Sequence, residues 1–177
     1  MAKSEKHDTL PAPDASGKTL LIVRAPYYKS IADNLLDGAR NAIEASGAKH
    51  ELIDVPGALE IAPAIAMASR TEKYDGFVAL GCVIRGETSH YETVCEESAR
   101  GITLLGLSGV CIGNGILTVE NRKQADVRAD PSDQNKGAGA AEAALHLMAF
   151  RETLEPKRRI GFGFAPESEQ FIMAEKS

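Results

Sequence analysis

Short apolar runs of strand length alternate along this chain with segments of helical spacing or composition. The apolar runs are residues 19–23, 50–55, 76–84 and 110–117. The segments expected to be helical are residues 31–43, 59–69, 89–107, 120–128 and 136–153. Parallel strands need a long crossover connection, which is usually a helix. The alternation therefore predicts an α/β fold, in which a four-stranded parallel sheet lies between two helical layers as a three-layer α/β/α sandwich.

The four runs differ in polarity. Residues 76–84 form the most hydrophobic run, which is typical of a buried strand. Residues 50–55 include charged side chains, and this places the second strand nearer an edge of the sheet.

Composition and charge exclude several classes of protein. The 177 residues, of which 44% are hydrophobic and 25% charged, suit one globular domain. The net charge of −5 gives no general electrostatic support for nucleic-acid binding. No apolar run approaches the roughly 18 residues that a membrane helix needs. Residues 1–17 also lack the apolar core of a signal peptide, so we predict a cytoplasmic protein.

The cysteines and the two ends of the chain carry weaker signals. Cys82, Cys95 and Cys111 lie in apolar or helical segments, and we interpret them as reduced, buried thiols. We expect a flexible N-terminal arm at residues 1–17, a catalytic domain at 18–153 and a C-terminal extension at 154–177. The extension is either a solvated tail or a strand or hook that packs on a neighbouring subunit.

Polar or glycine-containing segments lie at the carboxyl ends of the predicted strands. Ligands of open α/β sheets bind beyond the carboxyl ends of the strands, where these segments should meet. They are residues 24–28, 55–60, 84–90 and 113–118. Gly86, Glu87 and Thr88 directly precede a predicted helix, so free N–H groups and the positive end of the helix dipole would converge there. The sequence thus predicts an anion site, with phosphate as the best candidate.

A histidine lies just after this loop. His90 falls in the first turn of the predicted helix, where the dipole favours the neutral imidazole that serves as a base near neutral pH. A capping or packing role is the alternative. His7, His50 and His146 have no such context, and we assign them structural roles.

Other candidate residues are open to two interpretations. Tyr27 and Tyr28 are either core aromatics at a strand–helix junction or part of the site. Glu60 opens a helix, where it would also pair favourably with the helix dipole. Arg128 and Lys136 flank a polar turn and are either solvated cations or anion ligands.

Four motifs resemble those of the 6,7-dimethyl-8-ribityllumazine synthase family. Residues 55–61 are similar to its V-P-G-A-F-E-I, and residues 81–91 to its G-x-V-I-R-G-x-T-x-H-Y. Residues 115–121 are similar to G-[IV]-L-T-x-E-N, and residues 135–137 match N-K-G. The resemblance extends over about residues 18–150, and the combination of motifs is highly specific.

The resemblance implies a fold, a reaction and an assembly. It implies the strand order 2-1-3-4. Members of the family condense 5-amino-6-(D-ribitylamino)uracil with 3,4-dihydroxy-2-butanone 4-phosphate in riboflavin biosynthesis, release phosphate and water, and need no metal or redox cofactor. The active sites lie between subunits of a homo-oligomer.

The resemblance also implies roles for individual residues. His90 would transfer protons, Tyr27 would stack on the pyrimidinedione, and Glu60 would accept hydrogen bonds from the ribityl chain. Ala58 and Leu59 would contact the ribityl chain, and backbone groups of Cys82, Val83 and Ile84 would contact the heterocycle. The backbone amides of Glu87 and Thr88 would bind the phosphate. An adjacent subunit would supply Arg128 as a phosphate clamp, Asn114 as a contact to the ring and Lys136 as a nearby cation.

The chain departs from the family pattern at a few positions. Glu87 replaces the Ala or Gly of many relatives, so we expect only its backbone N–H to contact phosphate. Leu59 and Asn114 stand where Phe is frequent, which predicts looser contacts with the ring. Residues 129–134 differ from the G-[TG]-K-x-G turn that accompanies icosahedral shells, and this favours a pentamer or a dimer of pentamers.

Two other functions remain open. A protein on the same fold would bind a ribityl-pyrimidine or a flavin without turnover, but His90 and Arg128 together favour the enzyme, because a binder needs neither proton transfer nor a phosphate clamp. A flavodoxin-like FMN carrier would have its phosphate loop after the first strand. Residues 24–27 lack the Ser, Thr and Gly of such a loop.

Overall fold

The computed structural model describes residues 10–154 of the chain. A central sheet contains four parallel strands: β1 (Thr19–Arg24), β2 (Lys49–Asp54), β3 (Gly76–Ile84) and β4 (Ile112–Val119). Their order is β2-β1-β3-β4, so the predicted sheet and its strand order are confirmed. The more polar strand β2 lies at one edge, as its composition indicates, and β4 lies at the other.

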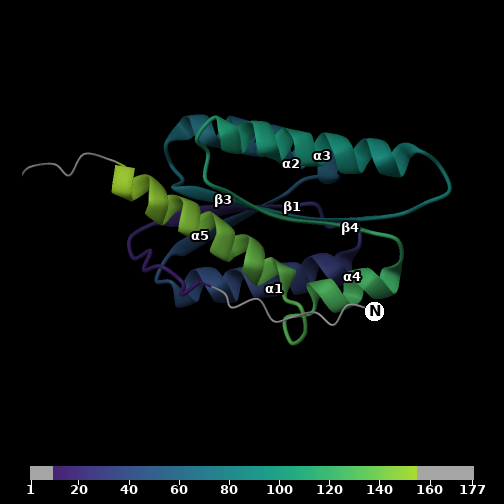
Figure 1. Ribbon diagram of the computed structural model, residues 1–177, viewed down its shortest axis with the longest axis horizontal. Coiled ribbons are helices and arrows are strands. Elements are labelled where there is room, and N and C mark those ends of the chain that lie inside the picture. The colour runs from purple at the N-terminus through teal and green to yellow at the C-terminus, as the bar shows by residue number, and fades with distance from the viewer. Residues whose placement is uncertain (1–9, 155–177) are drawn as a thin grey trace, which may run out of the picture.

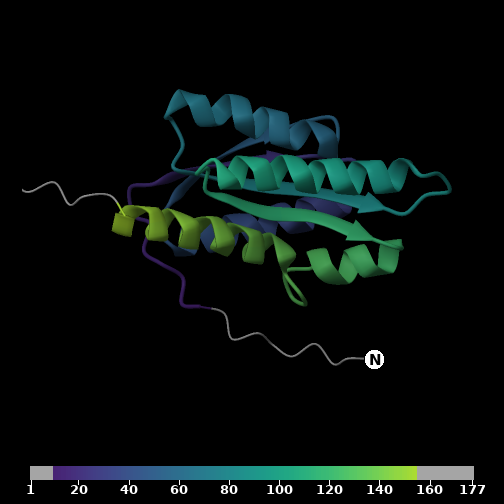
Figure 2. The same cartoon turned by 45° about the horizontal axis from the view of Figure 1, so that its top comes forward.

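Helices cover both faces of the sheet (Figure 1). One face carries α2 (Ala58–Ala68), which continues into a short 3₁₀ turn at Ser69–Thr71, and α3 (His90–Leu107). The other face carries α1 (Lys29–Ala45), α4 (Arg122–Ala129) and α5 (Lys136–Leu154). In the turned view, α2 and α3 run side by side over the sheet (Figure 2). The three-layer α/β/α architecture is therefore confirmed.

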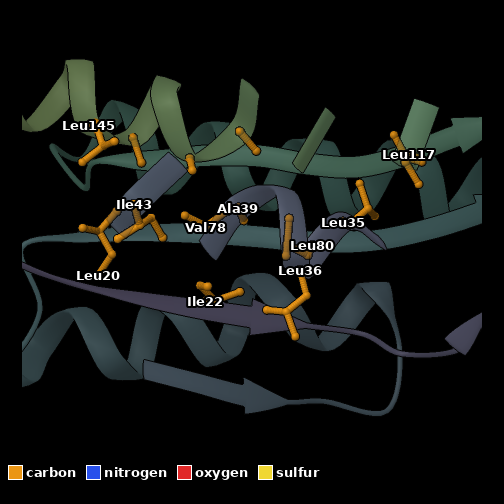
Figure 3. Close-up of a cluster of buried hydrophobic side chains, with 14 of the residues drawn as sticks. Leu20, Ile22, Leu35, Leu36, Ala39, Ile43, Val78, Leu80, Leu117 and Leu145 are labelled. Carbon is orange, nitrogen blue, oxygen red and sulfur yellow. The ribbon is translucent and has the colours of Figure 1, made fainter. Parts of the chain in front are cut away.

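Alternate residues of the central strands supply the two hydrophobic cores. Leu20 and Ile22 of β1 pack into the core beneath α1 and α5, whereas Leu21 and Val23 pack into the core beneath α2. Figure 3 shows the first of these cores, where Leu35 from α1 and other aliphatic side chains meet the strands. Successive side chains of a strand point to opposite faces, so a strand covered on both sides is apolar throughout.

Glycines let helix α5 lie very close to its neighbours. A Cβ on Gly113 of β4 would lie 1.7 Å from the carbonyl oxygen of Ala140. A Cβ on Gly137 would lie 2.0 Å from the carbonyl oxygen of Leu35 in α1. The backbones of β4, α5 and α1 are thus in direct contact, and no larger residue fits at these positions.

The N-terminal segment and one cysteine differ from what the sequence predicts. Part of the expected flexible arm packs on the domain, because Ala15 is buried and its N–H donates a 2.8 Å hydrogen bond to the carbonyl oxygen of Ser46. Cys82 and Cys111 are buried free thiols, but Cys95 is only half-buried, so the expectation of three buried thiols was wrong for Cys95.

The remaining expectations on the two ends fall on residues 1–9 and 155–177, which lie outside the described residues. Within residues 10–154, no helix has both the length and the apolar character needed to cross a membrane.

Candidate active site

A cavity of about 440 Å³ opens at the carboxyl ends of β1 and β3, the end toward which the strand arrows point in Figure 2. Its walls come from the loop after β1, the start of α2, the end of β3 and the first turns of α3. The lining residues are Ala25, Tyr27, Tyr28, Pro56, Gly57, Ala58, Leu59, Glu60, Cys82, Val83, Ile84, Gly86, Thr88, His90, Tyr91 and Val94. The volume and the mostly apolar lining with a few polar groups are typical of a small-molecule site.

The structure brings most of the candidate residues together in this cavity. Nine of them line it: Tyr27, Ala58, Leu59, Glu60, Cys82, Val83, Ile84, Thr88 and His90. Four do not: Glu87, Asn114, Arg128 and Lys136. Glu87 lies between two lining residues, so its backbone is close to the cavity although its side chain is exposed.

The expectation that residues 113–118 gather at the carboxyl ends of the strands was wrong for most of them. They belong to β4 itself, which runs from Ile112 to Val119. Asn114 is paired in register with Ala79, in the middle of β3, and its Oδ1 accepts a 3.0 Å hydrogen bond from the N–H of Ile116. Asn114 is therefore exposed on the edge strand and remote in register from the carboxyl ends of the strands.

The two cations after β4 also lie outside the cavity lining. Arg128 is in the last turn of α4, where its guanidinium Nη1 donates a 3.1 Å hydrogen bond to the carbonyl oxygen of Gln124. Lys136 is the exposed first residue of α5. Within one chain, neither residue contributes to the wall of the cavity.

The loop after β1 presents an aromatic ring to solvent. Tyr27 is 75% exposed, which excludes the interpretation as a core aromatic. Tyr28 instead packs against the hydrophobic core, and burial raises the pKa of its hydroxyl. The two rings meet edge to face, with centroids 5.0 Å apart and planes at 73°. The half-buried ring of Tyr28 thus supports the exposed ring of Tyr27 at the mouth of the cavity.

The loop between β3 and α3 has the geometry of an anion site. The N–H groups of Gly86, Glu87 and Thr88 donate no hydrogen bond to any described residue. They lie just before the N-terminus of α3, an 18-residue helix. Unpaired N–H groups at the positive end of a helix dipole attract a phosphate or another anion.

His90 is the first residue of α3 and is exposed to the cavity. It follows the anion loop directly, and Glu60 from the first turn of α2 lines the same cavity. An imidazole in this position can exchange protons with a ligand bound between the loop and the helix.

Arg85 braces the same loop from its other end, and sequence reasoning had missed this role. Its Nε donates a 2.6 Å hydrogen bond to Glu120, and its Nη1 donates to Glu92 in the first turn of α3. The guanidinium carbon lies 4.2 Å from the centroid of the Tyr91 ring, which lines the cavity. The hydrogen bonds that Arg85 donates, first to Glu120 and then to Glu92, raise the pKa of its guanidinium. The brace ties the end of β3 to α3 and to the residue after β4.

Cys82 brings a thiol to the cavity wall. Its side chain is largely removed from water, and this burial raises the pKa of the thiol to about 11. A neutral thiol is a weak nucleophile, so Cys82 serves here as a small apolar wall residue.

Further lining residues had not been singled out as ligand contacts. They are Ala25, Pro56, Gly57, Tyr91 and Val94. Most are immediate neighbours of predicted residues. His90, Tyr91 and Val94 have the spacing of one helix face, a signal from which Tyr91 and Val94 could have been found.

The sequence as a whole matches one family. A sequence model of 6,7-dimethyl-8-ribityllumazine synthase matches residues 17–152. A protein of that name from Jannaschia sp. (strain CCS1) is 53% identical over 154 residues, which cover 86% of this chain and 86% of the relative. Proteins of that name from Novosphingobium aromaticivorans and Zymomonas mobilis subsp. mobilis are each 58% identical, over 75% and 76% of this chain and 95% and 96% of their own length. The chain belongs to the 6,7-dimethyl-8-ribityllumazine synthase family.

Proposed function

We propose that this protein forms 6,7-dimethyl-8-ribityllumazine from 5-amino-6-(D-ribitylamino)uracil and 3,4-dihydroxy-2-butanone 4-phosphate, with residues 18–153 as the catalytic domain. The observation that carries the proposal is the cavity itself. It combines an open aromatic ring, an unpaired row of N–H groups and a histidine, and these are the groups that a heterocycle, a phosphate and a series of proton transfers require.

The ribityl-pyrimidine occupies the side of the cavity between β1 and α2. Tyr27 stacks on the pyrimidinedione, and its exposed ring leaves a face free for this purpose. Glu60, in the first turn of α2, accepts hydrogen bonds from ribityl hydroxyls, while Ala58 and Leu59 contact the chain. Backbone groups of residues 82–84 read the edge of the heterocycle.

The butanone phosphate occupies the side near α3. Backbone N–H groups of Glu87 and Thr88 bind the phosphate and stabilise its negative charge while the bond to the butanone breaks. Glu87 is exposed and is not a lining residue of the cavity, so its negative charge does not need to be desolvated beside the phosphate. Arg85 stiffens the loop by its hydrogen bonds to Glu120 and Glu92.

His90 moves the protons. Schiff-base formation, phosphate elimination and ring closure each require a proton to be gained or lost, and a neutral imidazole next to the phosphate loop can serve all three. Holding both substrates in one cavity supplies a large part of the remaining acceleration, because it replaces an encounter in solution.

A neighbouring subunit completes the site. Arg128, Asn114 and Lys136 lie outside the cavity of their own chain, and this supports their delivery to the cavity of an adjacent chain. A ring in which each chain gives residues to the next is a heterologous interface that closes on itself. We infer a pentamer or a dimer of pentamers.

One assay tests the proposal. Purified protein is incubated with both substrates, and the fluorescence of the lumazine product is followed over time, with phosphate release measured in parallel. His50→Ala is the matched histidine control. His50 lies at the amino end of β2, forms a hydrogen bond with Glu44 and does not line the cavity. Binding of the ribityl-pyrimidine without product formation would instead establish the non-catalytic alternative.

A further inference from the structure

One buried charge has no part in the chemistry proposed above. Among residues 10–154, Arg24 is the only charged residue in the buried interior, with 9% of its surface exposed. It is the last residue of β1 and does not line the cavity. Burial of a guanidinium costs free energy unless hydrogen-bonded carboxylates compensate for the lost hydration, so Arg24 needs such partners.

Arg24 joins the ends of the two strands by a bidentate ion pair. Its Nε donates to Oδ1 of Asp54 and its Nη2 donates to Oδ2, both at 2.8 Å. Asp54 is the last residue of β2 and is the register partner of Arg24. The parallel geometry of the two bonds matches the fork of a guanidinium to the two oxygens of a carboxylate.

A third bond ties helix α1 to the same point. Nη1 of Arg24 donates a 2.8 Å hydrogen bond to Asp33, whose other oxygen accepts a 2.6 Å hydrogen bond from Lys29. The hydrogen bond from Arg24 holds the pKa of Asp54 below its ordinary value, and that from Lys29 does the same for Asp33. Two cations and two carboxylates thus form a balanced cluster.

Both loops on one side of the cavity begin at this ion pair. Ala25 follows Arg24 directly and opens the loop that carries Tyr27. Pro56 lies two residues after Asp54 and opens the segment that carries Glu60. The N–H of Val55 also donates a 2.8 Å hydrogen bond to the carbonyl oxygen of Arg24. The two loops therefore start from the point where Arg24 meets Asp54.

We propose that Arg24 is a positioning residue that sets the distance between the Tyr27 loop and the start of α2 through its fork on Asp54, and thereby the affinity for the ribityl-pyrimidine. The inference rests on the function proposed above. The phosphate loop lies on the other side of the cavity and is braced separately by Arg85, so binding of the butanone phosphate should not depend on Arg24.

The test uses Arg24→Lys, which keeps the charge and removes the fork. The Michaelis constant for the ribityl-pyrimidine should rise about tenfold, with kcat and the Michaelis constant for the butanone phosphate within about twofold of the unchanged protein. Asp54→Asn should show the same selectivity. The matched control is Arg100→Lys, which alters an exposed ion pair with Glu97 on α3 away from the cavity.

A second measurement is independent of activity. Amide hydrogen exchange of peptides that cover residues 25–28 and 55–60 should become faster in Arg24→Lys, whereas exchange of residues 86–90 should stay the same. If the unchanged protein makes no lumazine, the proposed function fails, and these exchange rates still test the positioning. Unchanged exchange in both loops overturns the proposal. Equal increases in both Michaelis constants also overturn it, because they would indicate general loosening of the fold.

Discussion

At the scale of single residues, His90 is where the proposed chemistry is concentrated. It is the first residue of α3, exposed to the cavity and next to the unpaired N–H groups of the phosphate loop. His90→Ala should slow turnover by a factor of roughly 10 to 10⁴, because it removes proton transfer, and should leave substrate binding nearly unchanged. Steady-state kinetics with fluorescence detection checks this. A rate equal to that of the His50→Ala control would return His90 to a capping role.

Cys82 gives a prediction that depends on pH. Burial raises its pKa to about 11, so almost all of the thiol is neutral at pH 7.5 and only the thiolate is alkylated. Its alkylation by iodoacetamide should be slow at pH 7.5 and should rise by about tenfold per pH unit until the pH approaches the pKa. Mass spectrometry of the labelled peptide measures the rate, with denatured protein as the control. Native labelling as fast as that of the denatured chain would contradict the assigned environment.

Substitution of Arg128 tests whether the reaction needs a guanidinium or only a positive charge at this position. Arg128→Lys should weaken the reaction about tenfold or more, because an ammonium cannot reproduce a bidentate contact with phosphate. The loss should appear in the Michaelis constant for the butanone phosphate and not in that for the ribityl-pyrimidine. Equal weakening toward both substrates would contradict the assignment.

At the scale of elements, helix α5 is held by contacts between backbones. A Cβ on Gly137 would lie 2.0 Å from the carbonyl oxygen of Leu35, so Gly137→Ala forces α5 away from α1. We expect a loss of about 2–3 kcal/mol in the free energy of unfolding. The control is Gly139→Ala in the same helix, where a Cβ meets nothing within 4 Å and helix propensity improves. Chemical denaturation measures both, and equal stability of the two variants would contradict the packing argument.

Most of the helices and strands could be predicted from the sequence, but the close contact at Gly113 could not. The alternation of apolar runs and helical segments predicted every strand and helix of the sheet domain, because burial on one or both faces dictates that pattern. Residues 113–118 were also expected at the carboxyl ends of the strands, where ligands of open α/β sheets bind. Gly113 instead lies within β4, where the absence of a side chain admits the backbone of α5 at Ala140. Such a contact has no local signature in the sequence.

At the scale of the whole molecule, one residue of the proposed site lies outside the cavity of its own chain. His90 and Arg128 lie in different regions, and only His90 lines the cavity. Mixing inactive His90→Ala chains with inactive Arg128→Ala chains under conditions of subunit exchange should restore activity, because some interfaces then combine an intact His90 with an intact Arg128. Lumazine fluorescence measures the recovery, and native mass spectrometry verifies that mixed rings form. Mixed rings without activity would place both residues in the site of one chain.

The candidate site was predictable to the extent that its residues lie in the motifs. Nine of the proposed residues line one cavity, because the motifs follow the ends of β1 and β3 or begin α2. The two arginine clusters could not be predicted in this way. Arg24 meets Asp54 from 30 positions away, and Arg85 meets Glu120 from 35 positions away. A charged residue at the end of a strand looks like a solvated one until the strand order brings its partner beside it.

The parallel sheet also has a consequence for how the chain folds. No two of its strands are joined by a hairpin, and even the β1–β2 pair joins residues 30 positions apart. Each pairing therefore requires closure of a long loop before any ladder bond forms, which makes the search for the native topology slow compared with that of a helical bundle. Strand β1 pairs with both β2 and β3, so the backbone N–H and C=O groups along one edge of this apolar strand stay unpaired until β3 has been synthesised. During translation, this edge is where a nascent chain would recruit a chaperone or pair wrongly with another copy.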